Sequence, residues 1–285
     1  MRAINFSSVS ETLFLPLYAR AIETVSRNPV INDPVSVAVV RVLDEQFRDT
    51  DSAMLRAMVR RALPKRLPVT IGLRTRAFDR YIAAFIGKHP DAVVINLGCG
   101  LDTRFARIDN GTIDWYNIDL PPVIRLREEL LSPRPRERNI AASVLDHEWM
   151  NGVDRNNRPV IIYAEGLFMY LTEAGVKSLL LALQRKFPDS ELVAEVFNFS
   201  WVKRLEHPYF RWKFKRQLHM DKDALFTYGI RTSRDFELFG PGFSYLDEWN
   251  YFDEKEKKQG WYNLAGKLKT VRSVQWTVHY RIAGV

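Results

Sequence analysis

The stretch AVVINLGCGLDTRFARID, residues 92–109, decides the fold class of this chain. A short strand-like apolar segment runs into two glycines around a cysteine, and a charged, helix-competent segment follows. Glycine has no Cβ, so it allows a tight turn or the close approach of another group to the backbone. The stretch predicts a buried strand that ends at Gly98, where either the turn is merely tight or a ligand comes close.

The alternation of strand and helix continues along the chain. Near-continuous apolar segments predict strands that are buried on both faces, and amphipathic segments after Pro121 and after Thr172 predict helices between them. This order is typical of a parallel, doubly wound α/β sheet. The final segment, 273–285, alternates apolar and polar residues and predicts an antiparallel edge strand. The other predicted strands are DWYNID (114–119), RNIAASVLD (138–146), VIIYAEG (160–166) and ELVAEVF (191–197).

Two regions do not follow this alternation of strands and helices. Residues 1–68 predict an N-terminal helical cap, with Asp33 and Pro34 as a helix start and the prolines at 64 and 68 as its end. Residues 69–285 then form a Rossmann-like domain, whose first helix contains RAFDRYIAAFI (76–86). Within that domain, the aromatic-rich residues 198–242 predict a helical lid insertion over the ligand-binding edge of the sheet.

Composition narrows the class of protein. The 285 residues are 46% hydrophobic, and no apolar run approaches the length of a membrane span, so we expect a soluble, cytoplasmic protein without a membrane partner. The single cysteine, Cys99, excludes an internal disulfide framework, and the five histidines lack zinc-ligand spacing, so no structural metal is indicated. The net charge of +8 favours anionic partners without choosing among them.

The most basic cluster, KRLEHPYFRWKFKRQLH at 203–219, interleaves aromatic residues as some nucleic-acid-binding faces do. However, Phe210, Phe214 and Leu218 are spaced like one face of a helix. An amphipathic helix is therefore favoured over a nucleic-acid surface.

The position of Gly98 and Gly100 in the predicted sheet indicates a role in ligand binding. In open α/β sheets, ligands bind beyond the carboxyl ends of the strands. Asp119 ends the next strand, 21 residues after Gly98, where an acidic residue can accept both ribose hydroxyls; the alternative is an N-cap before Pro121. A dinucleotide fingerprint needs a third glycine where this chain has Thr103. S-adenosylmethionine, which has a ribose but no phosphate, fits better, and Cys99 is interpreted as a packed residue rather than a nucleophile.

Six motifs make a resemblance specific. The sequence is similar to the leucine carboxyl methyltransferase family, in particular to its bacterial polyketide O-methyltransferase branch. The resemblance implies a class I methyltransferase fold with a mostly parallel seven-stranded sheet. It also implies transfer of a methyl group from S-adenosylmethionine to a small-molecule carboxylate or phenolic hydroxyl. The motifs are PLYARAIE (16–23), DP (33–34), LRTRAFD (73–79), VINLGCGLDTRFARID (94–109), WYNIDLPPVIRLREELL (115–131) and YAEGLFMYL (163–171).

The same resemblance implies roles for individual residues. Arg74 would hold the cofactor carboxylate, its alternative being a surface arginine. Glu165 would lie near the cofactor amine, or would be a buried partner of Arg74 or Arg104. The remaining implied cofactor contacts are Gly98 and Gly100 in the loop, Asp119 at the ribose, and Ser143 and Val144 beside adenine, with Asp146 as another donor or acceptor there.

The methyl acceptor is less defined. Tyr18, Arg20 and Tyr170 are the candidate acceptor-binding residues, although each could be structural; Arg20, for example, could pair with Glu23. No His–Asp pair is placed as a general base, so the catalytic residue is unassigned and a carboxylate or acidic phenol is favoured. Methylation of a protein C-terminus, a non-catalytic nucleoside-binding module and an oxidoreductase remain alternatives. The sequence leaves the oligomeric state open.

Overall fold

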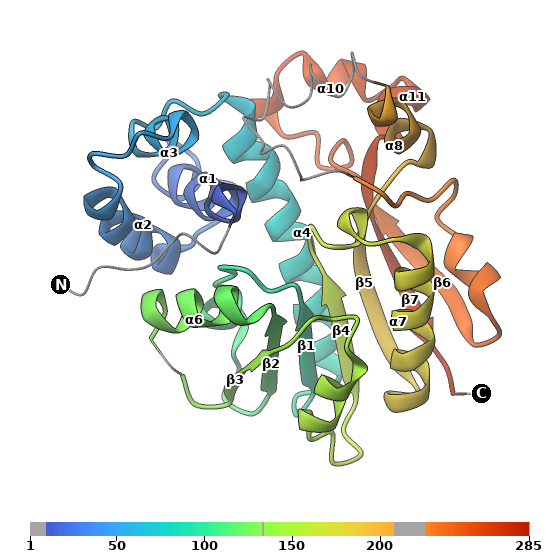
Figure 1. Cartoon of the computed structure of the whole chain (residues 1–285). Coiled ribbons are helices and arrows are strands. Elements are labelled where there is room, and N and C mark those ends of the chain that lie inside the picture. Colours follow the sequence, from blue (N-terminus) through green and yellow to red (C-terminus); the bar gives the residue numbers. More distant parts are fainter. Residues whose placement is uncertain (1–9, 133, 208–225, 285) are drawn as a thin grey trace.

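In the computed structural model, a single seven-stranded sheet is covered by helices on both faces (Figure 1). The structure describes residues 10–132, 134–207 and 226–284. The strands are β1 (Val93–Leu97), β2 (Asp114–Asp119), β3 (Glu137–Ala141), β4 (Val160–Ala164), β5 (Ser190–Phe197), β6 (Phe243–Trp249) and β7 (Gln275–Ile282). The α-helices are α1 (Phe14–Thr24), α2 (Pro34–Gln46), α3 (Ala53–Val59), α4 (Arg66–Lys88), α5 (Phe105–Ile108), α6 (Pro121–Leu130), α7 (Glu173–Lys186), α8 (Phe199–Glu206), α10 (Tyr262–Ala265) and α11 (Lys269–Arg272). Short 3-10 helices are η1 (Glu11–Leu13), η2 (His147–Gly152), η3 (Phe168–Tyr170), η4 (Asp235–Phe239) and η5 (Lys257–Gln259).

The strand order is β3-β2-β1-β4-β5-β7-β6. Strands β1 to β5 pair in parallel, which confirms the doubly wound sheet, and β1 has β2 on one side and β4 on the other. The order therefore reverses at β1. In doubly wound folds the ligand crevice lies at the carboxyl ends of the strands at such a reversal.

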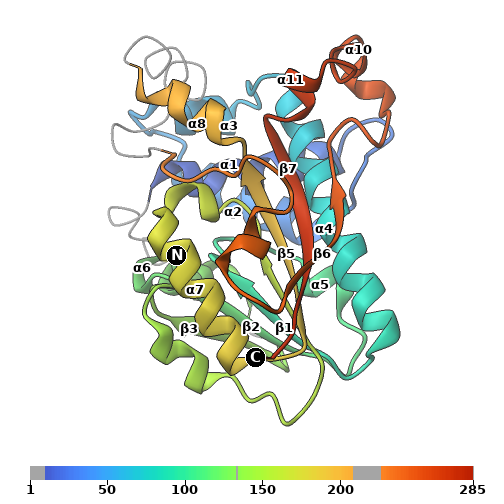
Figure 2. The ribbon, with the colours of Figure 1, turned by 90° about the vertical axis from the view of Figure 1, so that its right-hand side faces the viewer.

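The last strand differs from the prediction. Strand β7 is antiparallel, as expected, but it lies between β5 and β6 instead of at the edge (Figure 2). Its alternating apolar residues are buried because they pack in the main core cluster on one face of the sheet. The edge strand at this end of the sheet is β6, which pattern analysis missed because Asp247 and Glu248 are exposed and interrupt its apolar period.

The core confirms the predicted stripes. Alternate residues of β1 face opposite sides, since Val93 and Ile95 pack in the cluster under α7 while Val94 packs in the cluster under α4. The apolar stripe of α4 is buried there, and the predicted stripe of α7 is fully buried on the other face. The buried stripe residues are Phe78, Ile82 and Phe85 in α4, and Val176, Leu179, Leu180 and Leu183 in α7.

The N-terminal helices form a third apolar cluster over the sheet's carboxyl edge. It joins α1, α2 and α3 to Leu101 after β1 and Leu126 of α6. Asp33 caps α2 by accepting the Ser36 N–H, with Pro34 at the first helical position, as predicted. The predicted end at residue 68 is wrong as a helix boundary, because α4 begins at Arg66 and includes Pro68. Proline is tolerated in a first helical turn, where its missing N–H has no intrahelical partner.

The predicted insertion is described in two pieces, residues 198–207 and 226–242. The stripe of Phe210, Phe214 and Leu218 lies outside the described residues, so both the amphipathic helix and the lid stay predictions. Helices long and apolar enough to cross a bilayer are absent from the described part of the chain.

Candidate functional site

A cavity of about 690 Å³ opens at the carboxyl ends of β1, β2 and β4. The N-terminal helices and the start of α4 form its opposite wall. This volume lies within the range of about 300–1,000 Å³ typical of small-molecule sites. Its lining on the side of the sheet includes Asn96, Gly98, Cys99, Gly100, Asp119 and Glu165, and the opposite wall includes Leu13, Leu15, Pro16, Arg20, Ile71 and Arg74.

The glycine loop is fixed by its backbone. Gly98 and Gly100 have φ angles of 65° and 47°, a region that side chains with a Cβ rarely adopt. The N–H of Gly98 donates to the carbonyl oxygen of Ile118 at 2.8 Å, which holds the loop against β2. A Cβ at Gly98 would lie 2.9 Å from Cδ1 of Leu167, and one at Gly100 would lie 3.0 Å from Cδ1 of Leu13. The loop thus needs glycine both for its conformation and for its close neighbours.

Cys99 lines the cavity between the two glycines. Its side chain is buried, and burial raises the pKa of the thiol well above its ordinary value. The thiol therefore stays neutral near pH 7, in agreement with the packed role rather than that of a nucleophile.

Asp119 holds the loop from the neighbouring strand. One carboxylate oxygen accepts the Gly100 N–H at 2.8 Å and the other accepts the Leu120 N–H at 2.7 Å. The side chain does not cap α6, whose N-cap is Leu120 without a side-chain bond. Burial raises the pKa of Asp119 above its ordinary value. Because a carboxylate oxygen has two lone pairs, each oxygen retains capacity for a ligand hydroxyl at the cavity wall.

Arg74 is a buried residue, so the surface alternative is wrong. Its Nε donates to Glu165 at 2.7 Å, and its Nη1 lies 3.1 Å from a carboxylate oxygen of Glu195. The remaining nitrogen, Nη2, has no hydrogen-bond partner in residues 10–132, 134–207 and 226–284. Since Arg74 lines the cavity, this nitrogen is available to an anionic ligand group.

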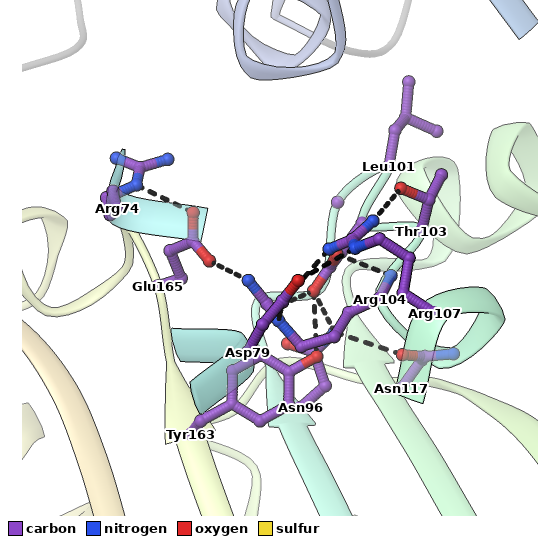
Figure 3. A network of polar contacts seen from close by, with 12 residues as sticks. Arg74, Asp79, Asn96, Leu101, Thr103, Arg104, Arg107, Asn117, Tyr163 and Glu165 are labelled. Carbon is purple, nitrogen blue, oxygen red and sulfur yellow. Dashed lines mark hydrogen bonds and ion pairs between the residues drawn. The ribbon is translucent and has the colours of Figure 1, made fainter. Parts of the chain in front are cut away.

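Glu165 lies between two guanidinium groups, as Figure 3 shows. One oxygen accepts from Arg74, and the other accepts from Nη2 of Arg104 at 2.6 Å. Burial opposes ionisation, but the two positive charges offset it and hold the pKa of Glu165 below its ordinary value. The predicted alternative, a buried partner of these arginines, is therefore present in the structure.

Beyond Glu165 the network runs under the glycine loop (Figure 3). Arg104 donates to Asp79 at 2.6 Å and also pairs with Asp102, which accepts from the hydroxyl of Tyr163 at 2.9 Å. Burial opposes ionisation of Asp102, but the positive charges of Arg104, Arg20 and Arg107 outweigh it and lower the pKa of this carboxyl. The loop after β1 is thus held from below by paired charges.

The three candidate acceptor-binding residues have different surroundings in the structure. Arg20 lines the cavity, but it donates to Asp33 at 2.9 Å and to the carbonyl of Leu101 at 2.8 Å. It does not pair with Glu23, which instead binds Lys258. Arg20 therefore braces the loop from above.

Tyr18 does not line the cavity. Its ring is fully buried among the N-terminal helices, and its hydroxyl donates to Asp44 at 3.0 Å. The structure does not support the expected acceptor contact by Tyr18. Tyr170, by contrast, lines the cavity, is 44% exposed, and has its ring 5.3 Å from that of Phe226.

The expected adenine pair does not line the cavity either. Strand β3 ends at Ala141, and the chain then turns, so Val144 packs in the main core and the hydroxyl of Ser143 accepts the Leu145 N–H. Asp146 caps η2 instead of reaching a ligand. The cavity wall next to Asp119 is formed by Leu120, which is 52% exposed.

Four cavity residues carried a signal that sequence analysis left unused. Leu120 directly follows the predicted ribose acid, and Phe197 and Gln275 lie at the end of β5 and the start of β7. Leu167 follows Glu165 by two residues. A position at a strand end near the sheet reversal would have indicated each of the first three.

In the described ranges, no group of three or more metal-ligating side chains is close enough to hold a metal ion.

Comparisons with known proteins agree with this geometry. Residues 14–184 match the leucine carboxyl methyltransferase family. The chain is 34% identical over 251 residues to the tetracenomycin polyketide synthesis O-methyltransferase TcmP of Streptomyces glaucescens, covering 88% of this chain and 86% of that protein. It is 28% identical over 284 residues to the S-adenosyl-L-methionine-dependent methyltransferase dpfgK of Gibberella zeae, covering 96% and 92%.

The fold is also found among solved structures. A crystal structure of a DUF574 family protein from Streptomyces avermitilis aligns with a TM-score of 0.54 and 14% identity, covering 96% of this chain and 97% of that one. That likeness concerns the fold, whereas the sequence matches identify the family. This chain belongs to the leucine carboxyl methyltransferase family and is an S-adenosylmethionine-dependent methyltransferase with the class I fold.

Proposed function

We propose that this enzyme methylates an ionised oxygen, preferably a carboxylate, on a small apolar molecule of ring-like shape. The observation that carries the proposal is the composition of the cavity. Beyond the loop and the charged residues, most of its lining is apolar, and no histidine of the described chain lines it.

The cofactor end of the cavity is the charged one. S-adenosylmethionine supplies an electrophilic methyl group on a positively charged sulfur. Arg74 would hold its carboxylate through Nη2, Glu165 would face its amine, and Asp119 would accept the ribose hydroxyls. Gly98 and Gly100 allow the positive φ angles with which the loop presents its backbone at the cavity wall. Leu120, in place of Ser143 and Val144, would lie against adenine.

The acceptor end is apolar. The apolar lining residues that we assign to this end are Leu15, Leu67, Ile71, Phe197 and Val274, and Tyr170 is the polar lining residue assigned to it. Such walls remove water from around an apolar substrate and leave its position to shape and a few polar contacts. A ring-shaped, apolar acceptor is consistent with the polyketide synthesis named for the relative TcmP.

The state of the nucleophile follows from the side chains near it. The carboxylates that line the cavity are engaged. Glu165 is held by two arginines, and Asp119 by two backbone N–H groups. Asp102 pairs with Arg104 and accepts from the hydroxyl of Tyr163. Burial keeps the Cys99 thiol neutral. Because no free base faces the acceptor in the described residues, an oxygen that is already ionised at neutral pH fits best. The enzyme's contribution is then alignment, which can account for about 7–11 kcal/mol of a barrier in well-oriented reactions.

The test is a screen with methyl-labelled S-adenosylmethionine and matched pairs of aromatic acceptors, one carrying a carboxylic acid and the other a phenol. Mild alkali separates the products, because methyl esters are hydrolysed and aryl methyl ethers are not. We expect label mainly in alkali-labile product. Label only in ethers would contradict the carboxylate preference, and transfer to neither class by a protein that binds S-adenosylhomocysteine would overturn the proposal.

A further inference from the structure

Glu195 is a fully buried carboxylate near the end of β5, where its strand neighbours Ala194 and Val196 are apolar and buried. A buried charge is costly unless hydrogen-bond donors or opposite charges surround it. Three donors from distant parts of the chain meet it. They are Nη1 of Arg74 at 3.1 Å, the hydroxyl of Tyr251 at 2.9 Å and the side-chain amide of Gln275.

Two of these donors belong to the cavity. Arg74 lines it at the end proposed for the cofactor carboxylate, and Gln275 lines it at the start of β7. Glu195 does not line the cavity itself. It is therefore placed to act on the site only through the residues that it holds.

The contacts fix how Arg74 presents its charge. Glu165 accepts from Nε and Glu195 accepts from Nη1, so the planar guanidinium is held at two of its three nitrogens. A guanidinium held at two points has little freedom to rotate, and its third nitrogen is presented in one direction. Without Glu195, Arg74 would retain only the bond from Nε to Glu165 among these contacts.

The contact with Gln275 fixes an amide orientation in the same way. An ionised carboxylate accepts hydrogen bonds and donates none, so the amide nitrogen of Gln275 must face Glu195. The amide oxygen then has no partner in the described part of the chain and remains available to a donor in the cavity.

We propose that Glu195 is a positioning residue of this methyltransferase, aligning Arg74 for the cofactor carboxylate and orienting Gln275 at the cavity wall. The proposal rests on the placement of the cofactor proposed above. It goes beyond that placement because it assigns a role to a residue that touches neither cofactor nor acceptor.

The experiment compares two ligands across two variants of β5. S-adenosylhomocysteine has the amino-acid carboxylate, whereas adenosine lacks it, so a defect in Arg74 alignment affects the first ligand alone. Glu195→Gln removes the negative charge that Arg74, Tyr251 and Gln275 surround. Glu191→Gln is the matched control, since it makes the same change in the same strand. It breaks a partly buried pair with His279 that lies away from the cavity.

Calorimetry should show that Glu195→Gln weakens S-adenosylhomocysteine binding by about tenfold to a hundredfold, the usual scale for losing one charge-assisted contact. Adenosine binding should change less than about twofold, and Glu191→Gln should leave both affinities near those of the wild type. Equal losses for both ligands, or equal effects of the two variants, would make Glu195 merely structural and overturn the inference. An unchanged affinity of Glu195→Gln for S-adenosylhomocysteine would also overturn it.

A second variant covers the case in which Glu195→Gln does not fold. Tyr251→Phe keeps the buried ring and removes one donor to Glu195. It should weaken S-adenosylhomocysteine binding severalfold with adenosine binding retained, and equal affinities to wild type would contradict the positioning role. If the wild-type protein bound adenosine but S-adenosylhomocysteine no more tightly, the proposed placement of the cofactor carboxylate would fail, and not this inference alone.

Discussion

Replacement of Arg74 by alanine is expected to destabilise the fold as well as cofactor binding. The substitution removes the cation shared by two carboxylates, one of which, Glu195, is fully buried. Glu165 would keep Arg104, but Glu195 would keep only the neutral donors of Tyr251 and Gln275. Breaking a buried ion pair from one side costs about 3–5 kcal/mol, because the remaining charge is left uncompensated. That is a large part of the 5–15 kcal/mol typical of a folded protein's stability.

The loss of stability in Arg74→Ala should depend on pH. In the wild type, burial works against ionisation of Glu165, but Arg74 and Arg104 hold its pKa below the ordinary value of 4.5. Its stabilising contribution is therefore present above that ordinary value and is lost as the pH falls through the lowered pKa. In Arg74→Ala, the pKa of Glu165 rises, and protonation at low pH relieves the buried charge. The difference in unfolding free energy between the two proteins should be largest near neutrality and should shrink toward pH 4.

The assay is urea unfolding followed by tryptophan fluorescence at pH 7.5, 5.5 and 4. Arg80→Ala is the control on the same helix, since Arg80 is 54% exposed and its pair with Glu254 should contribute at most about 1 kcal/mol. A loss in Arg74→Ala below about 1 kcal/mol at pH 7.5, or one equal at all three values, would refute the reasoning. If Arg74→Ala is destabilised as expected, a binding defect in this variant must be separated from partial unfolding.

Three other changes are expected to have distinct effects. Burial raises the pKa of Asp119, and a protonated carboxyl loses an acceptor for the ribose, so adenosine binding to the wild type should weaken as the pH falls through that raised pKa. Asp119→Asn should abolish this pH dependence in calorimetry. Gly100→Ala should weaken S-adenosylhomocysteine binding and lower stability by about 1–3 kcal/mol, because φ is 47° and the new methyl would lie 3.0 Å from Leu13; wild-type values for both would contradict it. Tyr170→Phe should raise the KM for the acceptor, whereas Tyr18→Phe should lower the melting temperature with KM unchanged, and the reverse pattern would reassign the two residues.

Local patterns predicted those parts of the fold that depend on local rules. The strand-glycine-helix stretch at 92–109 located β1 and its loop, and the spacing of apolar residues located the buried faces of α4 and α7. Asp119 was found in the same way, because its position at the end of a parallel strand places it at the carboxyl edge. Each of these predictions needed only the residues within one element and the geometry of that element.

The failures have a different origin. Strand β6 was missed because an edge strand has one solvated side and tolerates exposed acidic residues that interrupt its period. Ser143 and Val144 were assigned to adenine from the family resemblance, but β3 ends at Ala141 and the pair does not line the cavity. Tyr18 was a candidate acceptor contact with a structural role as its alternative, and its burial among the N-terminal helices favours the structural role.

The ion-pair network shows most clearly what periodicity cannot supply. Arg74 and Glu195 are 121 residues apart, and no pattern within α4 or β5 indicates that they meet. Yet Glu195 breaks the apolar period of its strand, as Asn96 and Asn117 break theirs, and the two asparagines are bonded across β1 and β2 at 3.1 Å. A strand that is buried on both faces has no solvated side for such residues, so each polar exception requires a partner from elsewhere in the fold. These exceptions lie close to the carboxyl ends of their strands, where the cavity opens. In a doubly wound sheet, polar residues that interrupt buried strands near those ends therefore indicate the supporting structure of the site, even where the partner is not predictable.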